Sequence, residues 1–348
     1  MRCQNRACLL ALLALFATLG LTYSLVTPLF EAPDEVWHCA YVRYLAEERA
    51  LPPLSAHTPA YQQVAQPPLY YAVAALVSGA VPDDDLQDLM WHNPGFGYQA
   101  GGTVNDNKNM LIHTGREASP WRGAVLAVRL ARFVSLAFGL LTVLAAWGLG
   151  QEAFPERPYL ALGVAAVVAF TPQFLFISSV ASNDGAAAAL ATAALWAIAR
   201  ALHRGATVRH SLILGLLVGL AALAKTSNLL LVPLTLAVFF ASLQVCKSSH
   251  WRLSFIVHCS LFMAMVLAVS GWWYVRNAVL YGDPFGFALH ANTPWGRATL
   301  ASLTTLLSEL PAVYRSFWGA FGWGHVEYPA WVYVALGVLV AVSLVGWG

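Results

Sequence analysis

Charged residues are scarce in this sequence. Only 10% of its 348 residues are Asp, Glu, Lys or Arg, whereas 59% are hydrophobic. Soluble domains carry roughly 25% charged residues, so the composition excludes an ordinary soluble protein. The alternation of apolar and polar residues that marks a transmembrane barrel is also missing, because long apolar runs take its place. We therefore predict an all-α, polytopic bundle of transmembrane helices, since helices satisfy their own backbone hydrogen bonds in lipid.

Cysteine pairs are missing as well. The five cysteines form no CxxC motif and no Cys/His spacing typical of a zinc site. The topology predicted below places only Cys39 clearly outside the cytoplasmic half of the protein. A lone outer cysteine has no intrachain partner, so we expect no disulfide framework.

The apolar runs define a topology. Arg2 and Arg6 place the N-terminus in the cytoplasm by the positive-inside rule. Basic clusters at 203–210 and 247–252 fall on the same side if residues 30–121 form one large extracytoplasmic loop. A cleaved signal peptide over the first 23 residues is the alternative to an uncleaved first helix. The predicted spans are residues 9–29, 122–150, 158–180, 185–203, 211–224, 228–244, 253–273 and 329–348.

Two segments of the large loop are apolar but short. Residues 36–48 and 68–81 are predicted to be helices that lie on the outer leaflet rather than cross it. Residues 274–328 form a second extracytoplasmic region, rich in aromatic side chains. We interpret residues 1–348 as a single transmembrane domain that ends within an apolar run, and so as a chain shortened at its C-terminus.

Acidic residues gather directly after the first span. In the run from Glu31 to Glu35, Asp34 is a candidate general base, and Glu35 is its candidate catalytic partner. The alternative is an acidic first turn that stabilises a helix starting at Pro33. Asp184 is a second acidic site or, alternatively, a helix N-cap. Asp34, Glu35 and Asp184 are also the candidate ligands of a divalent cation, Mg²⁺ or Mn²⁺.

Basic residues on the same predicted side run against the usual charge bias of membrane proteins. Arginine and lysine there suit an anionic lipid phosphate, and we expect Arg132, Lys225 and Arg276 to converge on Asp34 in one cavity open to lipid. Arg129 is a further candidate ligand. The alternative is that these side chains extend toward lipid headgroups or pair with nearby acids.

Several short stretches together resemble the GT-C membrane glycosyltransferases, of the protein O-mannosyltransferase and lipid A aminoarabinose transferase type. They occur in that family's order over roughly the first 235 residues. The stretch from Trp273 to Pro284, with Ser316 to Gly319, resembles a bacterial branch. The family-like stretches are Pro33-Asp34-Glu35, Gln66 to Tyr71, Ala131 to Ser135, Ser182-Asn183-Asp184 and Gly215 to Thr226.

The resemblance implies a polyprenyl-phosphate sugar donor and an active site on the outer face. By motif position Asp34 is the base, Asp184 the second acid, and Arg132 and Lys225 lie near the lipid phosphate. Tyr70, within the Pro-Pro stretch, is assigned to the substrate site. The chain departs from the pattern at Gln66, where His or Lys is common, and lacks the family's C-terminal spans.

The predicted function is inverting transfer of a sugar from a polyprenyl phosphate to an acceptor hydroxyl or amine. The acceptor is a glycan, lipid or protein, the location is the plasma membrane, and no nucleic acid is involved. A multi-pass transporter or flippase is the first alternative, but transporters bury their ionisable residues near the bilayer midplane. A polymerase or ligase of lipid-linked glycans is the second.

Overall fold

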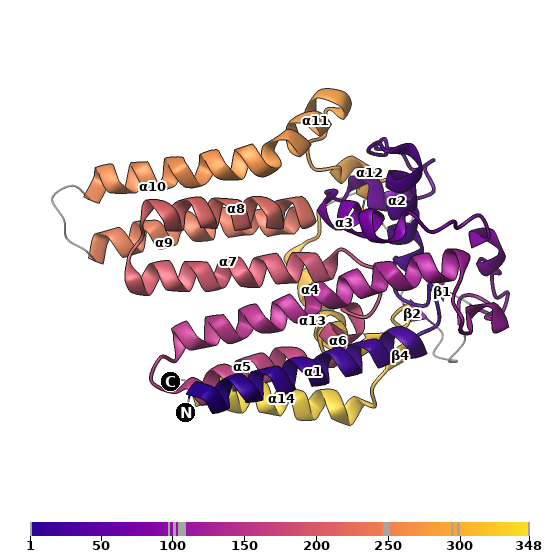
Figure 1. Cartoon of the computed structure of the whole chain (residues 1–348), viewed down its shortest axis with the longest axis horizontal. Helices are drawn as coiled ribbons and strands as arrows, with labels where there is room; N and C mark the ends of the chain where they lie inside the picture. Colours follow the sequence, from indigo (N-terminus) through magenta and orange to yellow (C-terminus); the bar gives the residue numbers. More distant parts are fainter. Residues whose placement is uncertain are drawn as a thin grey trace.

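The computed structural model describes residues 2–96, 98–99, 102–103, 109–245, 251–293, 296–297 and 300–346. It is mostly helical, as expected. Figure 1 shows the long helices running side by side, with the short helices that follow α1 gathered at one end of the bundle. Lys247 and His250, part of the second basic cluster, lie outside the described residues.

Four helical segments of the described chain are long and apolar enough to cross a membrane. Two are α1 (Arg2–Val26) and α4 (Gly123–Ala153). The third is α7 (Asp184–Arg204). The fourth runs through α10 (Trp251–Val266), a π-helical turn η5 (Leu267–Gly271) and α11 (Trp272–Tyr281). Shorter apolar helices stand beside them, namely α5 (Pro158–Ala169), α8 (Val208–Ala224), α9 (Leu231–Val245) and α14 (Ala330–Val345). The predicted helical membrane bundle is confirmed.

One predicted span is broken in two. Residues 158–180 form α5, which ends at Ala169, and a separate short helix, α6 (Pro172–Ile177). Pro172 has no N–H for the preceding turn, and its ring disfavours helical geometry at Thr171, which is extended. The expected continuous helix is therefore wrong at this point. The expected break at Lys225 is present, because this residue is extended between α8 and the 3₁₀ helix η4 (Thr226–Leu230).

The large loop contains the two helices expected there, α2 (Glu35–Glu48) and α3 (Leu69–Ser78). A 3₁₀ helix, η1 (Tyr61–Ala65), lies between them. Further along are η2 (Leu86–Leu89), the paired strands β1 (Tyr98–Gln99) and β2 (Gly102–Thr103), and η3 (Gly115–Glu117). Helix α2 begins at Glu35 and not at Pro33, because Asp34 has a left-handed backbone that no helix can include.

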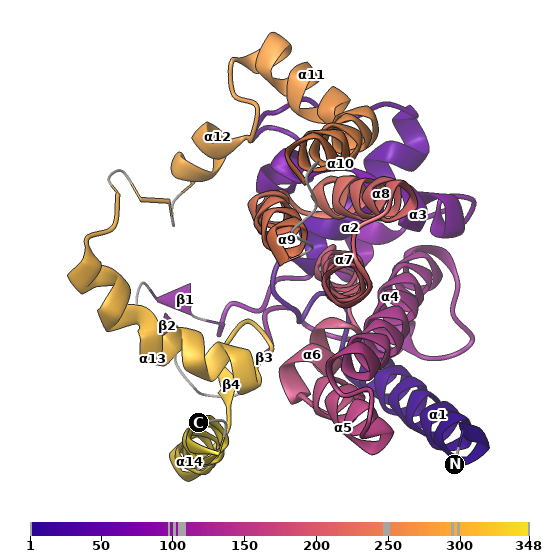
Figure 2. The ribbon, with the colours of Figure 1, turned by 90° about the vertical axis from the view of Figure 1, so that its left-hand side faces the viewer.

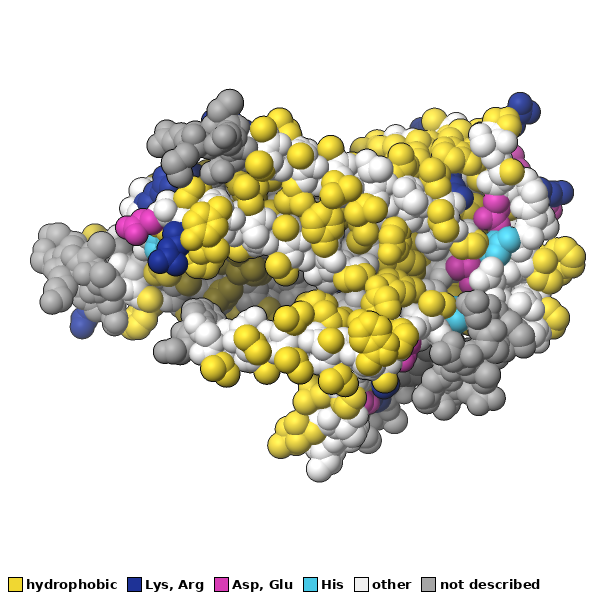
Figure 3. Space-filling view, turned by 90° about the horizontal axis from the view of Figure 1, so that it is seen from below, with side chains coloured by type: hydrophobic (Ala, Val, Ile, Leu, Met, Phe, Trp, Pro, Cys, Tyr) yellow, Lys and Arg dark blue, Asp and Glu magenta, His cyan; other side chains and the backbone are white. Residues whose placement is uncertain are grey.

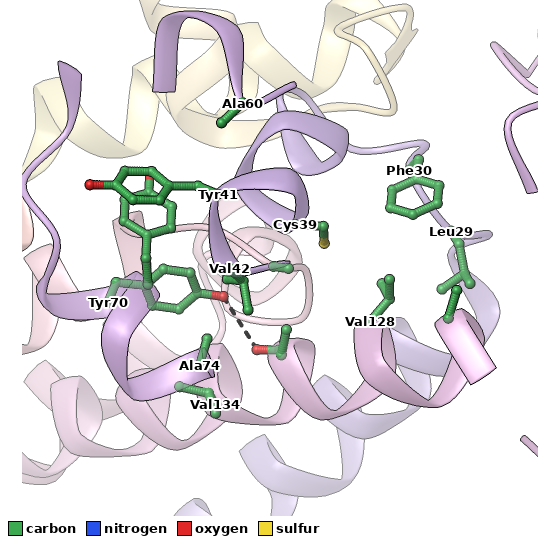
Figure 4. Close-up of a cluster of buried hydrophobic side chains, with 14 of the residues drawn as sticks. Leu29, Phe30, Cys39, Tyr41, Val42, Ala60, Tyr70, Ala74, Val128 and Val134 are labelled. Carbon is green, nitrogen blue, oxygen red and sulfur yellow. Dashed lines mark hydrogen bonds between the residues drawn. The ribbon is translucent and has the colours of Figure 1, made fainter. Parts of the chain in front are cut away.

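A buried cluster fixes α2 and α3 onto α4 (Figure 4). Tyr41 and Tyr71 stack with their ring centroids 3.9 Å apart. The Tyr70 hydroxyl donates to the Ala131 carbonyl oxygen at 3.3 Å and lies 2.8 Å from the Ser135 hydroxyl. The loop helices are thus packed against a membrane-spanning helix, which holds the residues at their ends in fixed positions.

The last part of the described chain contains α12 (Phe287–Ala291), α13 (Leu303–Gly319) and a hairpin of β3 (Ala320–Phe321) and β4 (Val326–Glu327). Figure 2 shows α14 and most of α13 set apart from the helices between α4 and α10. The hairpin is tied to α6, because the backbone N–H of Ala320 donates to the Gln173 side chain at 2.9 Å. Hydrophobic side chains cover the middle of the face in Figure 3, and most of its visible charges lie toward the two ends, as in a protein that crosses a bilayer.

Candidate active site

Asp34 lies at the start of α2, at the end of the bundle where the loop helices gather. Its φ of 62° places it in the left-handed region, which is uncommon for a residue other than glycine. Its carboxylate makes no cap hydrogen bond to α2. Instead it accepts hydrogen bonds from the side-chain amides of Gln62 (3.3 Å) and Gln63 (3.0 Å) on η1. The helix-capping alternative for this side chain is therefore not supported.

The environment of Asp34 makes it a stronger base than an ordinary aspartate. Burial raises its pKa above the usual 3.8, and the negative charge of Asp184 raises it further. The hydrogen bond from Gln62 and the positive charge of Lys225 lower it, without cancelling the effect of burial. A carboxylate with a raised pKa takes a proton more readily, which suits general-base catalysis.

A cavity of about 540 Å³ opens beside Asp34. Two of its walls are the indoles of Trp37 and Trp323, whose ring centroids lie 5.8 Å apart, nearly edge to face. The complete lining is Pro33, Asp34, Val36, Trp37, Gln62, His92, Phe96, Met110 and Trp323. The cavity therefore combines one carboxylate with apolar and aromatic surface, as small-molecule sites usually do.

Glu35 and Arg132 form a closed ion pair. Both side chains are fully buried, and Arg132 Nη2 lies 2.7 Å from Glu35 Oε2. The Glu35 carboxylate also accepts the backbone N–H groups of Phe30 (2.9 Å) and Ala181 (2.8 Å). Its oxygens are occupied, so we do not retain Glu35 as a residue that contacts substrate.

Arg132 has no N–H left for a phosphate. Its Nε and one Nη2 hydrogen donate to Glu35, and its other three N–H groups donate to backbone carbonyls at the end of α1 and just after it. Those acceptors are the oxygens of Ser24 (2.7 Å), Thr27 (2.7 Å) and Pro28 (2.8 Å). A guanidinium has five N–H donors, and all five are used. The predicted phosphate contact of Arg132 is thus replaced by a structural one.

Arg129 has a similar place one turn earlier on α4. It is 3% exposed and donates to the carbonyl oxygens of Ser24 and Leu25. Its guanidinium carbon also lies 5.6 Å from the ring centroid of Trp121. The last carbonyls of a helix lack intrahelical partners and carry partial negative charge. Arg129 and Arg132 together satisfy that end of α1, which explains cations at this depth without a ligand.

Asp184 and Lys225 form an ion pair that remains accessible. Lys225 Nζ lies 2.5 Å from Asp184 Oδ1, and the two side chains are 33% and 42% exposed. Asp184 is itself the first residue of α7, and its other oxygen accepts from the Ser182 hydroxyl at 3.1 Å. Lys225 lines two cavities, of about 380 and 520 Å³, and Asp184 lines the first. This pair is consequently open to a ligand from both sides.

Two other predicted site residues lie elsewhere. Arg276 on α11 donates to the Asn277 side chain at 2.9 Å and stacks over the rings of Trp273 and Tyr281. Tyr70 is fully buried, with its hydroxyl engaged on α4. None of the three cations expected to converge on Asp34 lines the cavity beside it. Lys225 acts on Asp34 through its charge, which lowers the pKa of that carboxyl.

The candidate metal ligands do not form an open set. Glu35 is taken by Arg132, and Asp184 is paired with Lys225. Within the described residues, no group of three or more His, Cys, Asp or Glu side chains is placed to hold a metal ion. These donors do not fit a divalent cation, and we derive no step through one.

Two residues that contact Asp34 were not singled out from the sequence. Gln62 and Gln63 bind Asp34 from a 3₁₀ helix, an element without a clear sequence signal. His38 is buried, lies 2.8 Å from the Tyr71 hydroxyl, and has its pKa lowered by burial to about 4, so it is neutral.

A second buried network holds the loop beside the cavity. Glu31 accepts the backbone N–H groups of Met110 (2.9 Å) and Leu111 (2.8 Å) and lies 3.0 Å from the His113 ring. Burial alone lowers the pKa of His113, but hydrogen bonds to Glu117 and Glu31 raise it to about 9. His113 is therefore charged at neutral pH and ties this part of the loop to Glu31, in the segment that follows α1.

A comparison with known protein families finds a match over the central helices of the chain. Residues 127–274 match the family model of the dolichyl-phosphate-mannose-protein mannosyltransferases. Over this stretch the chain is similar to that family. No curated protein and no solved structure matches the chain. The family match confirms the predicted resemblance. It also confirms the predicted enzyme class, a membrane glycosyltransferase that depends on a polyprenyl-phosphate sugar.

The residues that match this family model contain part of the candidate site. Asp184 and Lys225 lie within them, as do Arg129 and Arg132. Asp34 precedes them, and the hairpin of β3 and β4 follows them. Any role proposed for Asp34 therefore rests on its geometry and on the charges of Asp184 and Lys225 that act on it.

Proposed function

We propose that this chain transfers a sugar, with inversion, from a polyprenyl phosphate to an acceptor hydroxyl or amine at the outer face of the plasma membrane. One observation carries the proposal. A half-buried aspartate with a raised pKa lines a cavity, and the charge of an accessible lysine acts on it. Base and cation are the two groups that such a transfer needs.

Asp34 acts as the general base. It takes the proton of the acceptor O–H as that oxygen bonds to the anomeric carbon, and the bond from this carbon to the phosphate oxygen breaks. The electron pair leaves with the polyprenyl phosphate. Attack from the face opposite the leaving group inverts the anomeric configuration.

Lys225 stabilises the charge that develops on the leaving phosphate. A cation placed before the reaction at the site of developing charge is usually the largest electrostatic contribution to catalysis. Asp184 holds the ammonium group in place through the 2.5 Å ion pair. Asp184 thus acts as a positioning residue, in place of its predicted role as a second acid on the substrate.

The cavity that Lys225 shares with Asp184 suits the lipid part of the donor. Its other walls are largely apolar, with Phe174 and Ile177 on α6, Ala188 and Ala191 on α7, and Phe317 on α13. A prenyl chain keeps its tail among such side chains while its phosphate meets Lys225. Arg276 remains a candidate for contacting lipid headgroups from α11.

The alternatives fit less well. A transporter or flippase uses ionisable residues near the bilayer midplane, whereas Asp34 precedes α2 in the loop and Lys225 follows the last residue of α8. A polymerase or ligase would share the same chemistry and differ only in its acceptor. The basic residues near the N-terminus and at 203–210 favour a cytoplasmic location for the opposite end.

The test is a transfer assay with the purified chain in lipid nanodiscs. Radiolabelled dolichyl-phosphate mannose is the donor, and a mixture of alkyl glycosides and hydroxyl-bearing peptides is the acceptor. We expect transfer by the wild type, loss of transfer in Asp34→Asn, and wild-type transfer in Glu47→Gln. Glu47 is a matched control because it is an exposed acid on the same helix. Equal transfer by Asp34→Asn and wild type would exclude Asp34 as the base.

A further inference from the structure

The cavity beside Asp34 has features that the proposed roles of Asp34 and Lys225 do not use. Its far wall comes from the β3–β4 hairpin, which lies outside the residues of the family match. We infer that this cavity is the acceptor site, that it takes the ring of a carbohydrate, and that Trp323 and Gln62 select that ring. This inference rests on the function proposed above.

The hairpin is built to present Trp323. Gly322 and Gly324, on either side of it, have φ values of +60° and +85°, which residues other than glycine rarely adopt. A Cβ on Gly322 would also come 2.6 Å from the His325 ring. The Trp323 backbone N–H donates to His325 at 3.2 Å, and its indole N–H donates to the Phe30 carbonyl oxygen at 3.1 Å. The indole is therefore fixed before any ligand arrives.

Aromatic surface of this kind suits a sugar ring. The flat C–H faces of a pyranose pack against indoles, whereas its hydroxyl groups need hydrogen-bond partners at the edges. Trp37 and Trp323 meet nearly edge to face, and Phe96 adds a third aromatic side chain to the lining. Rings fixed in this way provide contact area with little loss of side-chain entropy on binding.

Gln62 provides the hydrogen-bond partner. It is 5% exposed, and its Nε2 donates to Asp34, which assigns its Oε1 as the other end of the amide. Within the described chain this oxygen has no hydrogen-bond partner, although it is buried in the wall of the cavity. A buried acceptor without a donor is costly. A second hydroxyl of the sugar, next to the one that reacts, would satisfy it after a small rotation of the amide.

The same arrangement accounts for the chemical step. The reacting hydroxyl gives its proton to Asp34 and bonds to the anomeric carbon of the donor sugar, while the polyprenyl phosphate leaves with the electron pair. The neighbouring hydroxyl binds Gln62, which itself orients Asp34. Gln62 thus couples recognition of the acceptor to the position of the base.

The experiment compares two acceptors in nanodiscs with labelled dolichyl-phosphate mannose, namely octyl α-mannopyranoside and an acetylated threonine peptide. We expect saturable transfer to the glycoside and little to the peptide. Trp323→Leu should raise the KM for the glycoside roughly tenfold, and Trp323→Phe should restore most of the loss. Binding of the labelled donor should not change in either variant. The matched control is Trp331→Leu, since Trp331 on α14 is 71% exposed.

Three results would overturn the inference. One is transfer to the peptide in preference to the glycoside, and another is an unchanged KM in Trp323→Leu. If Trp323→Leu misfolds and loses donor binding, Phe96→Leu is used instead, because Phe96 lines the same cavity and makes no bond like that of the Trp323 indole to Phe30. An unchanged KM for the glycoside in Phe96→Leu is the third refuting result. If the wild type does not consume the donor, or if Asp34→Asn consumes it equally fast, the proposed function and the inference are both refuted.

Discussion

Replacing Arg132 by methionine separates a structural role from a role in binding phosphate. The change leaves the Glu35 carboxylate fully buried without its cation. It also removes donors to three carbonyl oxygens at the end of α1 and in the two residues after it. We therefore expect a large loss of stability, and no direct loss of affinity for the donor lipid.

The magnitude follows from the burial of the pair. Removing one partner of a buried ion pair costs about 3–5 kcal/mol, because the other charge stays behind without compensation. At about 2 °C per kcal/mol, the melting temperature should fall by roughly 6–10 °C. The double variant Arg132→Met/Glu35→Met removes both charges and should recover part of the loss. Arg43→Met breaks partly exposed pairs with Glu47 and Asp83 and should cost at most about 1 kcal/mol.

The assay measures melting temperature in detergent alongside binding of labelled dolichyl-phosphate mannose well below that temperature. The structural role predicts a lowered melting temperature, partial recovery in the double variant, and unchanged donor affinity in the fraction that stays folded. An unchanged melting temperature together with weakened donor binding would refute this reasoning and restore Arg132 as a phosphate ligand.

Two further predictions concern the base and the packing of the bundle. Because the pKa of Asp34 is raised, the rate of transfer should fall with decreasing pH at a higher pH than an ordinary aspartate would give. Lys225 lowers this pKa and Asp184 raises it. In pH–rate profiles, Lys225→Met should therefore move the decline to higher pH, and Asp184→Asn should move it to lower pH. A Cβ on Gly148 of α4 would come 2.5 Å from a tryptophan ring of α7, so Gly148→Ala should cost about 1–3 kcal/mol of stability. Gly163→Ala, which meets open space, should leave the melting temperature unchanged or slightly higher.

The helices could be predicted because lipid imposes a strict rule on apolar length. α1, α4 and α7 follow directly from long runs with few charges. The break at Pro172 has a signal in the sequence, a proline within an apolar run. Hydropathy alone does not detect this signal, because the segments on both sides are largely apolar. The short loop helices were predictable from their length, whereas the packing of Tyr70 against α4 was not.

The roles of the charged residues were harder to predict, for a physical reason. A phosphate and the carbonyl end of a helix both attract arginine at the membrane boundary. Sequence alone does not distinguish Arg132, which satisfies α1, from Lys225, which stays accessible. The ligands of Asp34 depend on how η1 folds back over α2, and a 3₁₀ helix has no hydrophobic period to indicate this.

The central claim is that Asp34 takes the proton of the acceptor, and single-turnover kinetics of Asp34→Asn test it most directly. Preloaded, labelled dolichyl-phosphate mannose is mixed with saturating acceptor, and the first turnover is quenched and counted. We predict a rate lower by about 10²–10⁴, with donor binding equal to that of the wild type, because only the proton acceptor is lost. A first turnover as fast as that of the wild type would contradict the claim.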